Sequence, residues 1–566
     1  MAPLKQICAN WAPDNADCRK SGKYGCKNCQ VITYCDTSCQ KAHWPLHKVA
    51  CKSPLGKDTW QPAWVVERRT PAFIGGRHAP IFGDKKYLWG NVPAFDLLRL
   101  DANEGSAYRG DLRILCAASG DLRHVVKSIA ELPSSYRGSM EITLNDRDFD
   151  IVARNIILLL IATVVEDVDT ASDCMIHLWY SALVRESDFN ILQQHVRPVI
   201  MDVCRKISDR PSGTLLAKTW TFGQSSIRVV LEKSTWDRLL SFLDVPVGLD
   251  AHQAQGVRRN ITLAESRKDY RDRYMCCIPN RERLSFSRFR EDGILLPFGF
   301  PRHEFVVPNP TLFRDAKTWP MPDNADPRHG WPAQDVSQTS SGAASADIFG
   351  KLYFYLRAML SSFLVRLRSL EKVSFELFQK DVSALPDVLK PESFARIDVS
   401  NISDCGWLGI RHTLYYIVPL LQNPATNPHA TLITLFMNAV DETMTDEENF
   451  REIQPNTASS RRLLRYLPPS GGIMSEYDPK LIKFNMARDL VTKYDPVFNR
   501  YCDQFEFQKT GEVLGAVMKA RHTIIDRWPY RLKLRPGQPG AQEEFDQSLG
   551  GGLSSKERYV EWKRTD

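Results

Sequence analysis

The pattern of apolar and polar residues changes twice within residues 111–132, from a continuous apolar run to a polar break and then to a helical repeat. The run LRILCAA has the length of a short strand, and Ser119, Gly120 and Asp121 interrupt it. Apolar residues within 122–132 then recur at the spacing of a helix. This stretch therefore predicts a strand, a tight turn and a helix.

The same alternation continues in two further parts of the chain. MEITLNDRD, residues 140–148, predicts a second strand that ends in acids, and DFDIVARNIILLLIATVV predicts a long buried helix. Downstream, residues 394–404 and 429–440 read as strands on either side of the helical WLGIRHTLYYIVPLL. Alternating strands and helices predict a parallel α/β sheet assembled from two separate halves.

Composition narrows the class of protein. The chain has 566 residues, enough for about three domains, with 43% hydrophobic and 25% charged residues, as in a folded soluble protein. The start MAPLKQICANW lacks the apolar core of a signal peptide. The longest apolar run, Ile156 to Val165, is shorter than the roughly 18 residues of a membrane helix. We expect no membrane association and a location in the cytoplasm, the nucleus or both.

Cysteine is concentrated at the N-terminus. Seven of 14 cysteines lie in the first 51 residues, and in a reducing compartment such a cluster indicates metal ligands rather than disulfides. The ligands form four pairs, which would hold two structural zinc ions with no open position for catalysis. Two zinc ions and seven thiolates lower the formal charge of +7 to about +4. The pairs are Cys8 with Cys18, Cys26 with Cys29, Cys35 with Cys39, and His47 with Cys51.

This order of pairs resembles a MYND zinc finger, and the segment CQKAHWPLHKVAC matches the family's signature. The family usually opens with a Cys-x2-Cys pair, whereas nine residues separate the first two cysteines here. His43 is a spare histidine. The resemblance implies that Cys8, Cys18, Cys35 and Cys39 hold one zinc, and that Cys26, Cys29, His47 and Cys51 hold the other.

The resemblance also implies a partner. MYND fingers bind short proline-containing peptides of other proteins, and Gln40 and Trp44 occupy the positions that line the groove. An exposed tryptophan beside a polar side chain suits an extended proline-rich segment. The alternative is that Trp44 packs against the zinc core.

The body resembles fungal MYND-finger proteins that share the N-terminal domain of the dynein axonemal assembly factor 3 family. The residues that carry this likeness include LWGNVPAFDLLRLDANE, DLRILCAASGDLRHVVKSI and RYVEWKR. We expect a small two-zinc finger, then an α/β, Rossmann-like and methyltransferase-like domain with helical insertions and a mostly irregular or helical C-terminal tail. The expected division is 1–52 for the finger, 53–86 for a linker or lead-in, 87–195 for the first α/β half, 196–317 for a helical and irregular insert with a basic segment, 318–346 for a flexible linker, 347–445 for helices and the second half, and 446–566 for the C-terminal region.

A methyltransferase dependent on S-adenosylmethionine is the sharpest enzymatic hypothesis. Gly120 and Asp121 lie where such enzymes place a glycine-rich loop, and Asp146 lies where an acid would hold the ribose. The loop has one glycine where two or three are usual, and an Asp that caps a helix gives the same pattern. The Asn-His-Ser-Cys signature of SET-domain methyltransferases is missing from the sequence.

A basic segment offers a third reading. Residues 266–290 contain eight basic residues against three acids, with aromatic residues between them. Such a stretch can bind nucleic acid, but it is more often a solvated face or the site of an acidic partner. Within it, Cys276 and Cys277 lack a partner pair and read as buried thiols.

We therefore expect an interaction adaptor that docks proline-containing partner peptides through the finger, in transcriptional or developmental regulation. The alternatives are a methyltransferase that uses the α/β body and a regulator that binds nucleic acid.

Overall fold

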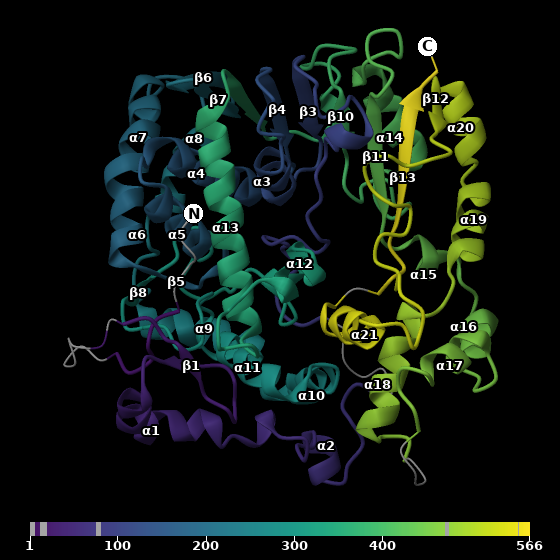
Figure 1. Ribbon diagram of the computed structural model, residues 1–566. Coiled ribbons are helices and arrows are strands. Elements are labelled where there is room, and N and C mark those ends of the chain that lie inside the picture. The colour runs from purple at the N-terminus through teal and green to yellow at the C-terminus, as the bar shows by residue number, and fades with distance from the viewer. Residues whose placement is uncertain are drawn as a thin grey trace.

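The computed structural model describes residues 6–11, 18, 20–74, 81–469, 475–552 and 554–565 (Figure 1). The N-terminal residues form a small finger at the lower edge of the molecule, and the remaining chain forms a body around a large sheet. Residues 12–17, most of the long spacing between Cys8 and Cys18, lie outside the described residues.

The body is built on a nine-stranded, mostly parallel sheet with the order β12-β13-β11-β10-β3-β4-β9-β7-β6. The six strands from β11 to β7 are parallel to one another, whereas β6 and β13 run antiparallel to their neighbours. The two predicted halves thus meet in one sheet, because β10 lies directly beside β3. The strands are β3 (Leu112–Cys116), β4 (Met140–Asn145), β6 (Leu215–Phe222), β7 (Ser225–Glu232), β9 (Val373–Phe378), β10 (Arg396–Asp398), β11 (Thr431–Phe436), β12 (Ala516–Met518) and β13 (Arg558–Arg564), with β5 (Leu183–Arg185) and β8 (Phe305–Pro308) pairing separately.

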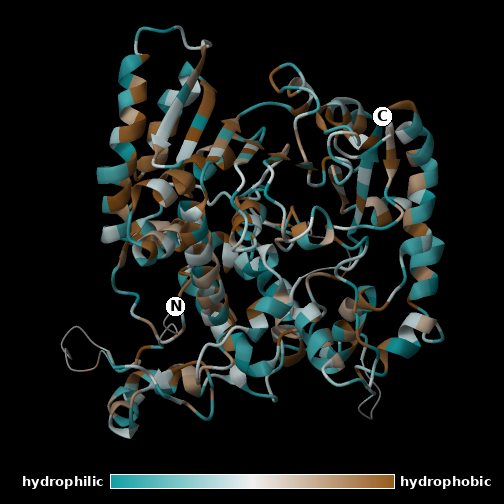
Figure 2. Ribbon diagram, turned by 45° about the horizontal axis from the view of Figure 1, so that its top comes forward, coloured by the Kyte–Doolittle hydropathy of each residue, from teal (hydrophilic) through white to brown (hydrophobic). Residues whose placement is uncertain are grey.

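Both faces of the sheet are covered. Along β3, Ile114 and Cys116 point into one hydrophobic cluster, while Leu115 points into another, because successive residues of a strand face opposite sides. The first cluster is shared with the helices that follow β3 and β4, and the second with helices near the C-terminus. Burial on two faces explains why the parallel strands read as nearly continuous apolar runs (Figure 2).

Helices form the layers around this sheet. The long helix α13 packs against α3 and α5 beside the sheet. The principal helices are α3 (Arg123–Ala130), α4 (Phe149–Val164), α5 (Val168–Tyr180), α6 (Glu186–Ile191), α7 (Arg197–Lys206), α8 (Lys233–Leu240), α9 (Ala251–Thr262), α10 (Lys268–Met275), α11 (Arg283–Asp292), α12 (Ala333–Gln338), α13 (Ile348–Ser369), α14 (Gly409–Ile417), α15 (Ala439–Thr443), α16 (Asp446–Glu452), α17 (Ala458–Leu463), α18 (Pro479–Ala487), α19 (Asp495–Gln504), α20 (Phe507–Val513) and α21 (Ala541–Gly550).

The C-terminal region differs from the mostly irregular or helical tail that we expected. RYVEWKR forms β13, which lies inside the sheet between β11 and β12. Trp562 of this strand is 1% exposed and donates from Nε1 to Thr434 Oγ1 at 3.1 Å. The last strand of the chain thus completes a sheet that begins at residue 112, and no local pattern could reveal that pairing.

The segment 318–346 also differs from the flexible linker that its composition predicts. It contains α12, and the side chains of Trp319, Met321 and Trp331 are almost fully buried. Trp331 donates to the Tyr180 hydroxyl at 2.9 Å. Its prolines and small residues shape a path over the core, and its scattered aromatic residues anchor it there.

Among the described residues, α13 is the one helix long and apolar enough to cross a membrane. Of its most apolar window, 61% is buried inside the protein, as expected of a core helix.

Candidate functional site

The N-terminal finger consists of a two-stranded hairpin and one helix. Strands β1 (Tyr24–Gly25) and β2 (Thr33–Tyr34) pair antiparallel and precede α1 (Thr37–Cys51). Asp36 caps this helix, accepting a hydrogen bond from the Cys39 amide at 2.8 Å. The cap fixes the first turn, which carries one predicted ligand, and the last turn carries two others.

The first cluster contains Cys8, Cys18, Cys35 and Cys39, whose sulfurs all lie within 4.8 Å of one another. The Sγ atom of Cys18 lies 3.3 Å from that of Cys39 and 3.5 Å from that of Cys35. Sulfurs around a tetrahedral zinc are about 3.8 Å apart, so the spacing suits this metal. Burial raises the pKa of the Cys18 thiol to about 11, and the charge of a bound cation would offset that effect.

The second cluster contains Cys26, Cys29, His47 and Cys51, all buried. His47 Nε2 lies 3.6 Å from Cys29 Sγ, and Cys26 Sγ lies 3.7 Å from Cys51 Sγ. The Asn28 amide donates to Cys51 Sγ at 3.2 Å, which is an outer contact that orients a ligand. The two clusters of four ligands fit two structural zinc ions.

The spare histidine belongs to neither cluster. His43 Nδ1 lies 3.0 Å from the Tyr34 hydroxyl, and burial lowers the pKa of this imidazole. It therefore supports the hairpin from α1.

Gln40 and Trp44 both lie on α1, and Trp44 lies beside the second cluster. The Trp44 ring is tilted over His47 with a centroid separation of 5.8 Å, yet 38% of the residue is exposed. Gln40 is half-buried. The sequence left open whether Trp44 is exposed or packs against the zinc core. In the structure it does both, because it contacts a metal ligand on one side and solvent on the other.

The finger is held firmly against the body. Trp11 Nε1 donates to the Gly299 carbonyl at 2.9 Å, and the Ala346 amide donates to the Gln30 carbonyl at 2.9 Å. Gly25 approaches so closely that a Cβ there would lie 2.2 Å from the Ala343 carbonyl oxygen. The finger therefore has a fixed inner side and an outer side formed by α1.

The three candidate cofactor residues lie together at the carboxyl edge of the sheet. Gly120 has a φ of +53°, and its amide donates to Asp146 at 3.0 Å. The other oxygen of Asp146 accepts from the Asp148 amide, and Asp121 accepts from the Gly90 amide at 2.9 Å. Burial raises the pKa of Asp146. These groups stabilise the turn through hydrogen bonds within the chain. Glycine is favoured at position 120 because a positive φ is easily adopted by glycine.

The chain itself crosses this edge. Within residues 88–95, Gly90 is so close to Arg123 that a Cβ would lie 2.4 Å from its Nε. Asn91 contacts Met437, which follows β11, at 3.7 Å, and the Ala94 amide donates to the Gly330 carbonyl at 2.9 Å. Residues 88–95 therefore occupy the end of the sheet where such folds commonly bind ligands.

The basic segment 266–290 mainly faces inward. Arg267, Arg283 and Arg290 are each less than 9% exposed and contact aromatic rings and backbone carbonyls of the body. Cys276 and Cys277 are buried free thiols, as the sequence indicated. Most arginines of this segment are therefore not exposed, and they do not form the solvated face that we considered.

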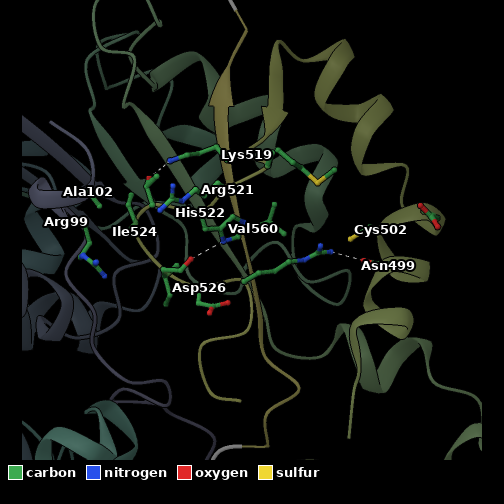
Figure 3. Close-up of a pocket in the computed structure, with 16 residues that line it drawn as sticks. Arg99, Ala102, Asn499, Cys502, Lys519, Arg521, His522, Ile524, Asp526 and Val560 are labelled. Atoms are coloured by element: carbon green, nitrogen blue, oxygen red, sulfur yellow. Dashed lines mark hydrogen bonds between the residues drawn. The ribbon is translucent and has the colours of Figure 1, made fainter. Parts of the chain in front are cut away.

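A cavity that the sequence reading missed lies between α19, β13 and the loop 519–527 (Figure 3). Its volume is about 1130 Å³. Much of its charge is used internally: Glu561 accepts from the amides of 523–525 and pairs with Lys519 at 2.9 Å, and Arg527 donates to Asn499 at 2.8 Å. The basic loop KARH was the signal in the sequence, but this pattern alone specifies no ligand.

Comparison with known proteins identifies two parts of the chain. Residues 15–51 match the MYND finger family, and the structure adds Cys8 to the ligands that this match contains. The N-terminal unit is a MYND zinc finger. Residues 88–184 match a family described as a domain of unknown function (DUF4470). The matched part of this chain contains β3, β4 and residues 88–95, which cross the edge of the sheet.

The similar curated proteins share the finger region alone. N-lysine methyltransferase SMYD2 of Mus musculus is 46% identical over 50 residues, which are 8% of this chain and 11% of that protein. N-lysine methyltransferase SMYD2-B of Danio rerio is 37% identical over 49 residues, again 8% of this chain and 11% of the relative. The chain thus matches about a tenth of the length of these relatives. No solved structure matches the chain.

Proposed function

We propose that this protein is an interaction adaptor whose MYND finger docks a proline-containing peptide of a partner protein, in transcriptional or developmental regulation. The observation that carries the proposal is the position of Trp44, which rests on zinc ligand His47 and remains 38% exposed. An aromatic ring held by a metal-bound framework offers a rigid apolar surface at little entropic cost. Gln40, one turn earlier on α1, supplies an amide for the backbone of an extended peptide.

The body serves in this proposal as a scaffold that fixes the orientation of the finger. Several hydrogen bonds join the two parts, so a partner held by the finger would have a defined position relative to the body. The DUF4470 match falls on part of the stretch that resembles the dynein axonemal assembly factor 3 family. Membership in its fungal branch is part of the proposal, as is a location in the cytoplasm or nucleus.

The test is binding of full-length protein to an array of 15-residue proline-containing peptides. Trp44→Ala should reduce binding at least tenfold, with Gln40→Ala reducing it less. Trp407→Ala is the matched control, since that tryptophan is 60% exposed on the body and should have no effect. Equal binding by the Trp44→Ala variant, or no binding by the original protein, would refute the proposed docking site.

A second candidate, the methyltransferase, is favoured by the strand order. Apart from the hairpin β6–β7, the order β9-β4-β3-β10-β11 is that of doubly wound sheets, with a switch point between β3 and β10. Against it stand the internal bonds of Gly120, Asp121 and Asp146 and the chain segment across the edge. Native mass spectrometry decides between the two: bound S-adenosylmethionine, lost in Asp146→Ala, would favour the enzyme.

A further inference from the structure

The outer side of α1 carries an exposed apolar stripe. Ala42, Leu46 and Val49 follow the spacing i, i+4 and i+7, which places them on one face of the helix. Leu46 is 74% exposed and Val49 is 75% exposed. Single exposed apolar residues are common on protein surfaces, but here the three exposed residues lie together along one face of the helix.

A row of lysines runs alongside the stripe. Lys41, Lys48 and Lys52 follow the spacing i, i+7 and i+11, and all three are exposed. On a helical projection this row lies between the apolar stripe and Trp44. The lysine row, the stripe and the Gln40–Trp44 pair therefore form one continuous surface.

Nothing described within the finger neutralises this row. The helix α1 contains no acidic residue, and Asp36 before it is engaged in capping. Among the described residues no ion pair involves a lysine of the row, and Lys48 and Lys52 form a like-charged i, i+4 pair, which is locally unfavourable. Body helices are different, because Lys206 and Lys233 each pair with an aspartate four residues away.

Charge complementarity identifies the kind of partner. An acidic segment would neutralise the lysines, and apolar residues within it would cover Leu46 and Val49. A nucleic acid would pair its phosphates with the lysines but leave the aliphatic stripe uncovered. The geometry points to a peptide.

We propose that the outer face of α1 binds a segment of the partner rich in acidic and apolar residues, adjacent to the proline-containing peptide at Gln40 and Trp44. This inference rests on the proposed function and names the chemistry of the partner beyond its proline core. It also gives the long α1 helix a role besides carrying metal ligands.

The experiment uses fluorescent peptides that share the best proline core from the array. Each has an eight-residue flank of Leu alternating with Glu, Gln or Lys, and binding to full-length protein is measured by anisotropy at 50 mM salt. The Glu flank should tighten binding roughly tenfold over the Gln flank, and the Lys flank should weaken it. The double substitution Lys41→Glu and Lys48→Glu should reverse that preference.

Controls separate the possible failures. Lys493→Glu with Lys563→Glu makes the same change in net charge on exposed lysines of the body and should leave the preference unchanged. Two retained zinc ions in native mass spectra confirm that each variant is folded. Leu46→Ser with Val49→Ser should weaken the binding of all three flanked peptides, because each flank contains leucine.

The outcomes distinguish this inference from the proposed function. If the core binds through Trp44 but the flank charge has no effect, the inference is wrong and the adaptor stands. If no core binds, the proposed function fails. Tighter binding of a 20-base-pair DNA duplex, sensitive to the substitutions at Lys41 and Lys48, would assign the row to nucleic acid and overturn the inference.

Discussion

Two basic regions of this protein have opposite arrangements. In the arginine-rich segment 266–290, Arg267 is 3% exposed, pairs with Asp323 at 2.8 Å and stacks over the ring of Tyr270 at 3.6 Å. On α1, the lysines point outward with no ion pair among the described residues. Guanidinium groups are weakly hydrated, planar and rich in donors, whereas an ammonium is a strongly hydrated point charge. In these two regions, the buried arginines of 266–290 are used for contacts within the body, whereas the lysines of α1 remain exposed to solvent.

Metal removal should have the largest effect on stability, and it should unfold only the finger, whose helix α1 carries the lysine row. Structural zinc supplies on the order of 10 kcal/mol or more of folding free energy in small zinc domains. A strong chelator should therefore unfold the finger and abolish peptide binding, while the sheet keeps its cooperative melting transition. Circular dichroism and zinc analysis measure both. Loss of the body transition at the same chelator concentration would show that the sheet depends on the finger.

Arg267→Ala should be the most destabilising single substitution in the comparison. It leaves Asp323 buried without its partner, which costs about 3–5 kcal/mol when a buried pair is broken. Lys48→Ala is the matched exposed change and should alter the free energy of unfolding by less than about 0.5 kcal/mol. Urea unfolding of both variants checks this difference, and equal effects would erase the contrast between the two regions.

Acid should affect the finger and the body at different pH values. Burial opposes ionisation of Asp326, but Arg328 at 2.7 Å and His329 outweigh it and hold its pKa well below the usual range. Because a depressed carboxyl pKa stabilises the fold above the unfolded value, this stability is present above about pH 4 and is lost as the pH falls further. Zinc ligands compete with protons at milder acidity, so the finger should release zinc first. The check is an acid titration that follows zinc content and tryptophan fluorescence, with Asp326→Asn flattening the second step.

Salt should produce the smallest effect. Raising NaCl from 50 to 500 mM shortens the Debye length about threefold, so it screens exposed charges much more than buried ones. Binding of an acidic peptide to α1 should weaken severalfold, while the unfolding midpoint of the body changes little. Anisotropy and thermal melts in the same buffers test this. A large salt effect on the body would mean that its arginine pairs are more exposed than their burial indicates.

Local patterns were sufficient for the finger and for the first strands and helices. The spacing of cysteines predicted two four-ligand sites, and the structure places the same eight side chains in two clusters. Period changes located β3, α3, β4 and α4 closely, because strand and helix periodicity is a property of neighbouring residues. The strand predicted at 394–404 is shorter, since β10 covers only Arg396–Asp398 before the chain turns at Ser400 with a φ of +53°.

The sequence by itself determined which residues gather around zinc, because ligand chemistry acts over a few residues and tolerates few substitutes. Only the tertiary structure decided which basic residues face solvent, which strand completes the sheet, and that residues 88–95 cross its carboxyl edge. These outcomes depend on contacts between segments far apart in the sequence, as between Thr434 and Trp562, which are 128 residues apart. The packing of the whole chain decides whether a charged side chain faces solvent and which strands lie side by side. No short sequence pattern encodes that packing.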